Sequence, residues 1–135
     1  MLARWGDRKE ILSRGFVPVA RTFLLFAAHL RPDGVTPAEA MFVLQLMVHK
    51  WDERSPYPSY ERLAVRMGVS TVYVRKLART LDGKGFLKRT RVRGRTTMTF
   101  DLQPLFDRLA QHIRIHGSNE PRPGNPDQGS VGRAT

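Results

Sequence analysis

Hydrophobic residues between Ser59 and Leu81 recur at helical spacing in two adjacent segments. The first segment starts at Ser59, a favourable N-cap, and stops at Gly68, where the chain can turn through positive φ. Its apolar residues share one helical face: Leu63, Ala64 and Met67. This pattern predicts a short helix followed directly by a tight turn.

The second segment begins with another N-cap, Ser70, and a helix is expected from about Thr71 to Leu81. Its apolar residues lie three and four apart: Val74, Leu77, Ala78 and Leu81. The polar residues that remain point away from this face: Thr71, Tyr73, Arg75, Lys76 and Arg79. One side of the helix is therefore predicted to be buried, and the other to be open to solvent or a partner.

A basic hairpin is expected next, after the helix stops at Gly83-Lys84-Gly85. Residues 86–92 read as a strand, residues 93–95 as a turn and residues 96–102 as a returning strand, in which Met98, Phe100 and Leu102 alternate toward the core. Two helices joined by a tight turn present the second helix to a DNA major groove. We therefore predict an α+β, mostly helical fold: a winged helix–turn–helix with a two- or three-stranded β-wing. Residues 15–19 are expected to be extended, because proline disfavours helix in the residue before it, and they are the candidate for a third strand.

The apolar segment from Pro37 to about Trp51 is a second strong helix prediction. Thr36 is an N-cap, Pro37 suits the first helical position, and Glu39 completes a capping box. The helix is apolar nearly all round, which favours a place in the core. The alternative is that helix 37–51 also forms a homodimer interface, because a small domain seldom covers every side of a helix.

The remaining segments define the domain limits. Helices are expected over residues 21–30 and from Pro104 to about His116. Residues 1–15 read as an N-terminal arm, either partly ordered or used for minor-groove contact or dimerisation. Residues 117–135 contain many glycines and prolines and almost no large apolar residues, which predicts a disordered polar tail. The winged helix–turn–helix domain would span residues 16–116.

The distribution of charge indicates what kind of partner the protein binds. Residues 70–95 hold nine basic side chains against the single acid Asp82, a net charge of +8 out of +11 for the chain. A field of this density favours a polyanion, and we predict double-stranded DNA. The recognition helix would contribute Ser70, Thr71, Tyr73, Arg75, Lys76 and Arg79, and the wing Lys88, Arg89, Arg91, Arg93 and Arg95.

The run from Pro58 to Leu87 resembles the winged helix–turn–helix superfamily of bacterial and phage DNA-binding proteins. Within it, the chain is most similar to the N-terminal domain of plasmid and phage replication initiators and replisome organisers. There the wing is often followed by Tyr-Asp-Leu-x-Pro-Leu, which here reads Phe100-Asp101-Leu102-Gln103-Pro104-Leu105. The resemblance covers roughly residues 16–109 and implies sequence-specific DNA binding in replication initiation or its control.

Other functions are less well supported by the sequence. A small, possibly dimeric, repressor-like transcriptional regulator is the main alternative, and a winged helix for RNA or protein contacts is a second. The chain has no cysteine, and His112 and His116 lack an evident third metal ligand. No nucleophile–base pair is evident, so we expect no enzyme activity, cofactor or metal. No segment has the roughly 20 apolar residues of a membrane span, and a cytoplasmic, nucleoid- or plasmid-associated protein is expected.

Overall fold

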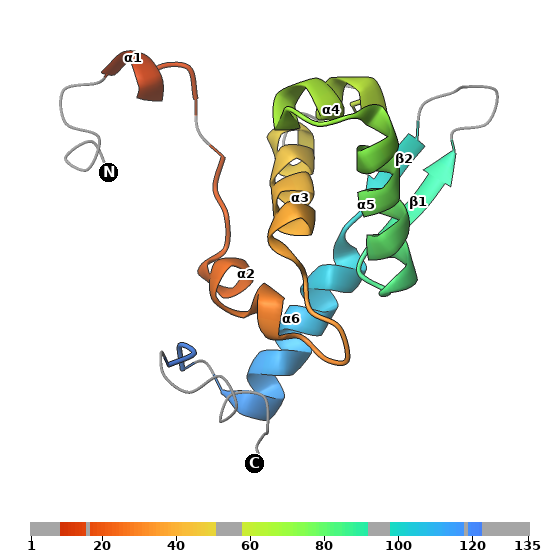
Figure 1. Cartoon of the computed structure of the whole chain (residues 1–135). Coiled ribbons are helices and arrows are strands. Elements are labelled where there is room, and N and C mark those ends of the chain that lie inside the picture. Colours follow the sequence, from red (N-terminus) through yellow and green to blue (C-terminus); the bar gives the residue numbers. More distant parts are fainter. Residues whose placement is uncertain (1–8, 16, 51–57, 92–97, 118, 123–135) are drawn as a thin grey trace.

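The computed structural model describes residues 9–15, 17–50, 58–91, 98–117 and 119–122. It is an α+β structure, mostly helical, with a two-stranded antiparallel sheet in the described residues (Figure 1). The elements in chain order are α1 (Lys9–Leu12), α2 (Arg21–Phe26), the 3-10 turn η2 (Ala27–His29), α3 (Pro37–Lys50), α4 (Tyr60–Met67), α5 (Thr71–Gly83), β1 (Lys88–Arg91), β2 (Met98–Asp101) and α6 (Gln103–His116).

Local capping residues set the helix boundaries, as the sequence predicts. In α3, the Thr36 amide donates to Glu39 Oε1 at 2.9 Å, and the Glu39 amide donates to Thr36 Oγ1 at 3.2 Å. The side chain of Ser59 accepts a hydrogen bond from an amide in the first turn of α4, and Ser70 does the same for α5, each at 3.1 Å. Gly68 ends α4 with φ +70°, a conformation that side-chain-bearing residues rarely adopt.

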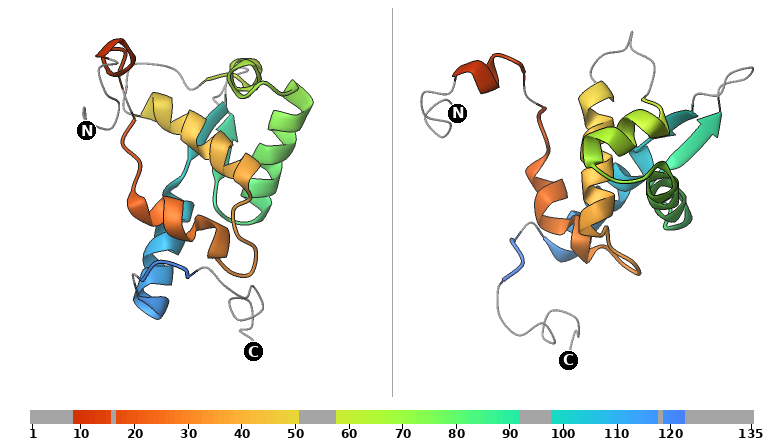
Figure 2. Two further views of the ribbon diagram at one scale, coloured as in Figure 1. Left: turned by 60° about the vertical axis from the view of Figure 1, so that its left-hand side comes forward. Right: turned by 45° about the horizontal axis from the view of Figure 1, so that its top comes forward.

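Helix α3 occupies the centre of the molecule. It lies between α2 on one side and α4–α5 on the other, and α6 crosses beneath it (Figures 1 and 2). Its core-helix prediction is confirmed, because Phe42, Val43, Leu46 and Met47 are buried, although Met41 and Val48 remain about half exposed. The largest fully buried side chains come from helices along the whole domain and from the start of the hairpin: Phe23, Phe42, Phe86, Leu46, Leu63, Leu81, Leu105, Val43 and Val74.

The hairpin is two-stranded, and the third strand expected over residues 15–19 is wrong for the part described. Lys88 pairs with Asp101 and Arg91 with Met98 in an antiparallel register. Val17 and Val19 have no strand pairing and instead pack, half-buried, against the core. Pro18 lies between them and has no amide hydrogen to give to a sheet, which disfavours pairing. Phe16 lies outside the described residues.

A buried ion pair connects α5 to the start of α3. Lys84 Nζ donates to Glu39 Oε1 and to the carbonyl oxygen of Gly34, both at 2.8 Å. The Glu39 side chain is 3% exposed and that of Lys84 is 16% exposed. Gly34 itself packs so closely that an added Cβ would clash with the backbone oxygen of Ala28. These contacts fix the end of α5, where the hairpin begins, against the helical body.

His112 lies in the packing between α2 and α6, where its surroundings change its pKa. Its ring lies 5.3 Å from that of Phe26 and 4.7 Å from that of His116. Burial, and then the charges of His116 and His29, lower the pKa of His112 below its ordinary 6.5. Among the described residues, no group of three His, Cys, Asp or Glu side chains is placed to bind a metal ion.

Acidification is therefore expected to destabilise the fold through His112. Below about pH 6.5 the unfolded chain takes up a proton that the folded protein resists, so the free energy of unfolding falls as the pH drops from there through the lowered pKa. Denaturant titrations between about pH 7.5 and 5 should show a smaller loss in His112→Gln than in the wild type. Equal losses in the two proteins would contradict this assignment.

Candidate nucleic-acid interface

Helix α5 places its predicted recognition residues on the surface. Its apolar face is fully in the core, with Val74, Leu77, Ala78 and Leu81 all 5% exposed or less. The opposite face carries the exposed Ser70, Tyr73, Arg75, Lys76 and Arg79, with Thr71 half-buried at the first turn. Because the two faces are opposite sides of one helix, packing of the first forces the second outward.

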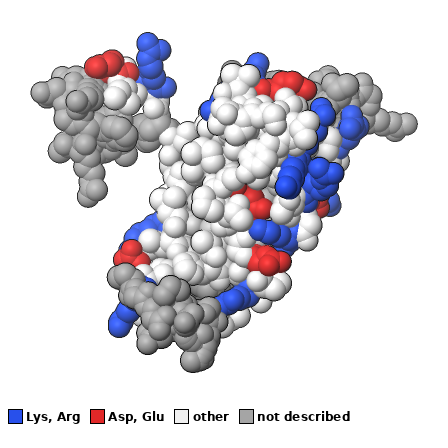
Figure 3. Space-filling view, viewed as in Figure 1, with Lys and Arg blue, Asp and Glu red and all other residues white. Residues whose placement is uncertain are grey.

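Basic side chains gather over α5 and the adjoining strand β1. Figure 3 shows this concentration on the right-hand side of the molecule, beside the largely uncharged surface of α3. Arg75 makes a long ion pair of 3.8 Å with Glu61, in which both side chains are more than half exposed. Such a pair contributes little to stability, so the Arg75 guanidinium stays available to another anion.

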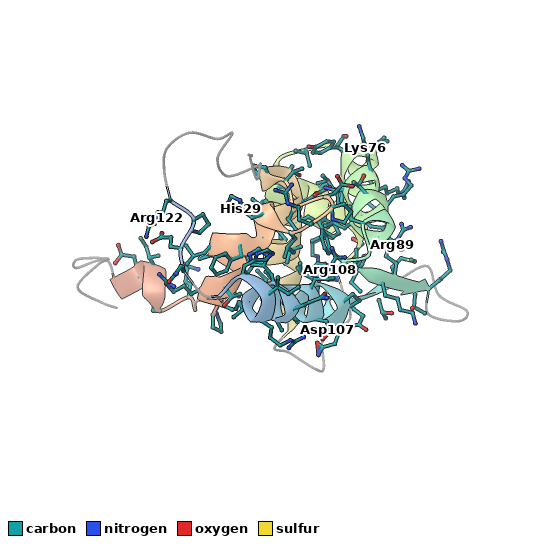
Figure 4. The ribbon with its side chains drawn as sticks, turned by 90° about the horizontal axis from the view of Figure 1, so that it is seen from below. His29, Lys76, Arg89, Asp107, Arg108 and Arg122 are labelled. Carbon is teal, nitrogen blue, oxygen red and sulfur yellow. The ribbon has the colours of Figure 1, made fainter. Side chains whose placement is uncertain are left out.

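In the hairpin, the predicted wing residues divide into three groups. Lys88 and Arg91 are exposed and make no ion pair with any described residue, whereas Arg93 and Arg95 lie outside the described residues. Arg89 differs, because its Nε donates to Asp82 Oδ2 at 2.9 Å (its position between α5 and β1 is visible in Figure 4). That hydrogen bond, and a smaller contribution from Tyr60, raise the pKa of Arg89.

The charge available at the surface is therefore smaller than the sequence count of +8 implies. Lys84 belongs to the basic run but is neutralised by Glu39, which is distant in sequence. Arg89 is paired with Asp82, the single acid of the same run, which the count of +8 already includes. The exposed cations that remain in the described part of this region are Arg75, Lys76, Arg79, Lys88 and Arg91.

A hollow of about 620 Å³ lies beside α5 and the hairpin and is lined by both. The beginning of α4 forms one wall, α5 the second and the two strands the third. Its aromatic, apolar and basic lining side chains are Tyr60, Arg75, Arg79, Arg89, Arg91, Met98 and Phe100, and one acid, Glu61, also lines it and pairs with Arg75. The hollow therefore joins the exposed face of α5 to that of β1 and makes one continuous basic surface.

The sequence pattern does not identify several residues of this surface. Tyr60 reads as an ordinary first-turn helix residue, and Met98 as a core residue, yet both line the hollow. Val72 is 72% exposed beside Thr71 at the start of α5, although its apolar side chain suggests burial. An aromatic residue directly after the Ser59 N-cap is the one available signal, and by itself it does not distinguish a site from the core.

A surface of this composition can bind phosphate groups and the edges of bases. Guanidinium groups form paired hydrogen bonds with phosphate, and arginine and lysine contact guanine in the major groove.

Within the described part of the chain, no helix is both long and apolar enough to cross a membrane.

Comparisons with known proteins agree with the fold. The N-terminal domain of DnaD protein from Geobacillus kaustophilus HTA426 matches with a TM-score of 0.61 and 24% sequence identity, over 82% of this chain and 93% of that chain. A search of curated proteins finds no match. The sequence profile of the DnaD N-terminal domain matches residues 25–120, which include all of α3 to α6. The chain belongs to the DnaD N-terminal domain family.

Proposed function

We propose that α4, α5 and the β1–β2 hairpin form a winged helix–turn–helix that binds double-stranded DNA sequence-specifically in replication initiation. The observation that carries this proposal is the exposed polar face of α5 with Arg75, Lys76 and Arg79, adjoining Lys88 and Arg91 of β1. Membership of the DnaD N-terminal domain family supports the replication role. The protein would act in the cytoplasm, on chromosomal or plasmid DNA.

In this proposal the two basic elements have different tasks. Helix α5 enters the major groove, where Lys76 and Arg79 contact guanine or phosphate and Thr71 and Val72 face base edges or thymine methyl groups. The hairpin lies along the flanking backbone, where Lys88 and Arg91 contact phosphates. Sequence is then read mainly by α5, while the hairpin adds affinity for any duplex.

Selection of bound fragments from a random duplex library, at near-physiological salt and with structured RNA as competitor, tests this function. Enrichment of directly repeated sites supports an origin-binding protein. Enriched inverted repeats favour a dimeric transcriptional regulator, because the symmetry of a site mirrors that of its protein. Failure to enrich any sequence contradicts specific recognition, and preference for the RNA contradicts duplex binding.

Removal of the hairpin charges is expected to lower the salt dependence of duplex binding. The double change Lys88→Ala and Arg91→Ala removes two phosphate contacts, so the slope of log K against log salt should fall by roughly two units. The double change Arg114→Ala and Arg122→Ala is the matched control. It removes the same charge from exposed positions, and Arg122 lies at the opposite end of the molecule from Lys76 (Figure 4). An unchanged slope in the hairpin variant would show that β1 does not contact DNA.

A further inference from the structure

The hollow between α5 and the hairpin combines two features that phosphate binding alone does not need together. It is lined by exposed arginines and by the more buried aromatic and apolar side chains of Tyr60, Met98 and Phe100. Its volume of about 620 Å³ falls within the range of small-ligand pockets, about 300–1,000 Å³. A nucleotide whose base is not stacked in a duplex carries both an anion and an exposed planar ring.

The arginines supply the anion-binding part. Arg79 projects from α5 and Arg91 from β1, so the two approach the hollow from different walls. Both are exposed, and neither forms an ion pair with any residue in the described ranges. Guanidinium groups bind phosphate with paired hydrogen bonds, so two of them on different walls of one hollow can both contribute to binding a phosphate there.

The floor supplies a surface for a planar ring. Tyr60 is half-buried, and its ring lies 5.9 Å from the ring of Phe100, in an edge-on arrangement that holds it in place. The guanidinium of Arg75 lies 5.6 Å from the Tyr60 ring centroid. Met98, also half-buried, adds a polarisable apolar side chain. Bases stack on aromatic rings and on guanidinium planes, but only when they are not already stacked in a duplex.

We infer that this hollow binds one unpaired nucleotide of single-stranded DNA. The phosphate lies between Arg79 and Arg91, and the base stacks against Tyr60 beside Met98. The inference goes beyond the proposed duplex function: it shares arginines with that interface but adds the Tyr60 ring, which duplex binding does not require. A protein with both properties binds preferentially where paired and unpaired DNA meet.

Three substitutions test whether the Tyr60 ring itself contributes to single-strand binding. Tyr60→Leu removes the stacking surface but keeps an apolar side chain against Phe100, and it is expected to weaken binding of a thymidine oligonucleotide of about 12 nucleotides by about tenfold. Tyr60→Phe keeps the ring and should bind like the wild type. Leu24→Ala removes an exposed apolar side chain of α2, outside the hollow and outside the α5–hairpin surface, and should leave single-strand affinity unchanged. Thermal melts establish that each variant folds.

Competition on the wild-type protein tests the same inference without any substitution. An abasic strand of equal length keeps every phosphate but has no bases, and it should compete about tenfold more weakly than the thymidine strand. Equal competition would overturn the inference, since the hollow would then bind phosphate alone. Stronger competition by a polyglutamate peptide would also overturn it and assign the hollow to an acidic protein segment.

Duplex titrations of the same variants distinguish this inference from the proposed function. Tyr60-dependent single-strand binding without any duplex binding would sustain the inference and overturn the proposed function. Duplex binding that is unchanged in Tyr60→Leu, with single-strand binding reduced, sustains both. Equal losses for duplex and single strand in Tyr60→Leu would overturn the inference, because the ring would then have no separate role.

Discussion

Replacement of Arg75, Lys76 and Arg79 together by alanine should reduce affinity for the selected duplex site by about 100-fold or more. Each contact of this kind contributes roughly 1–3 kcal/mol when it reaches a base edge. All three side chains are exposed on α5, and alanine is the best helix former, so the helix itself should be retained. The Arg75–Glu61 pair is too exposed for its loss to matter to folding. Electrophoretic mobility shifts or fluorescence anisotropy with the selected site measure the effect.

A triple control variant separates recognition from net charge. Arg21, Arg114 and Arg122 are exposed positions outside α4, α5 and the hairpin, and their replacement by alanine removes the same charge. This control should lose only the modest, non-specific part of the affinity. If both triple variants weaken binding equally, α5 contributes charge without reading sequence. If the α5 variant binds the selected site like the wild type, the assignment of α5 as the recognition helix is refuted.

Lys84→Met is expected to reduce the free energy of unfolding by about 3 kcal/mol. Removal of one partner of a buried ion pair leaves the other charge without compensation, at a cost of roughly 3–5 kcal/mol, and the slight exposure of Lys84 places the effect at the lower end. The substitution leaves the buried Glu39 carboxylate without its cation and removes the hydrogen bond to the Gly34 carbonyl. Urea denaturation followed by circular dichroism measures the change.

A double-mutant cycle tests the pairing itself. Glu39→Met should also be costly, because it removes both the ion pair and the capping box of α3. The double variant should be more stable than the sum of the two single losses predicts, since neither charge is then left buried alone. Lys88→Met is the control: it removes an exposed lysine of the same basic run and should change stability by less than about 0.5 kcal/mol. A Lys84→Met loss as small as that of the control would contradict a structural role for the pair.

The ion pair also bears on how the interface is oriented. Lys84 immediately follows α5 and precedes β1, so the contact with Glu39 fixes both basic elements relative to α3. Variants that retain the exposed cations but lose this pair should show weaker and less selective DNA binding at temperatures where they are still folded. The buried Lys84–Glu39 pair would then contribute to DNA binding indirectly, because it holds the exposed cations of α5 and β1 in position.

Much of the backbone could be predicted because its determinants are local. The capping box at Thr36 and Glu39, the serine caps of α4 and α5, and the positive-φ Gly68 all act over three or four residues. Helical spacing likewise identified the buried face of α5, because a helix that packs on one side must place residues three and four apart together. The candidate third strand around Pro18 is not paired with the hairpin, since strand pairing depends on how separate segments pack and not on the sequence pattern of one of them.

For the candidate interface, the sequence alone determined which elements carry the basic residues and which helical face is free of the core. The tertiary structure decided which of those cations are available. Lys84 is neutralised by Glu39 from the start of another helix, and Arg89 by Asp82 across the α5–β1 turn. The tertiary structure also decided that Tyr60, Arg79 and Arg91 line the same hollow. Periodicity reports only which side of its own element a residue occupies, whereas these pairings depend on how separate elements pack together.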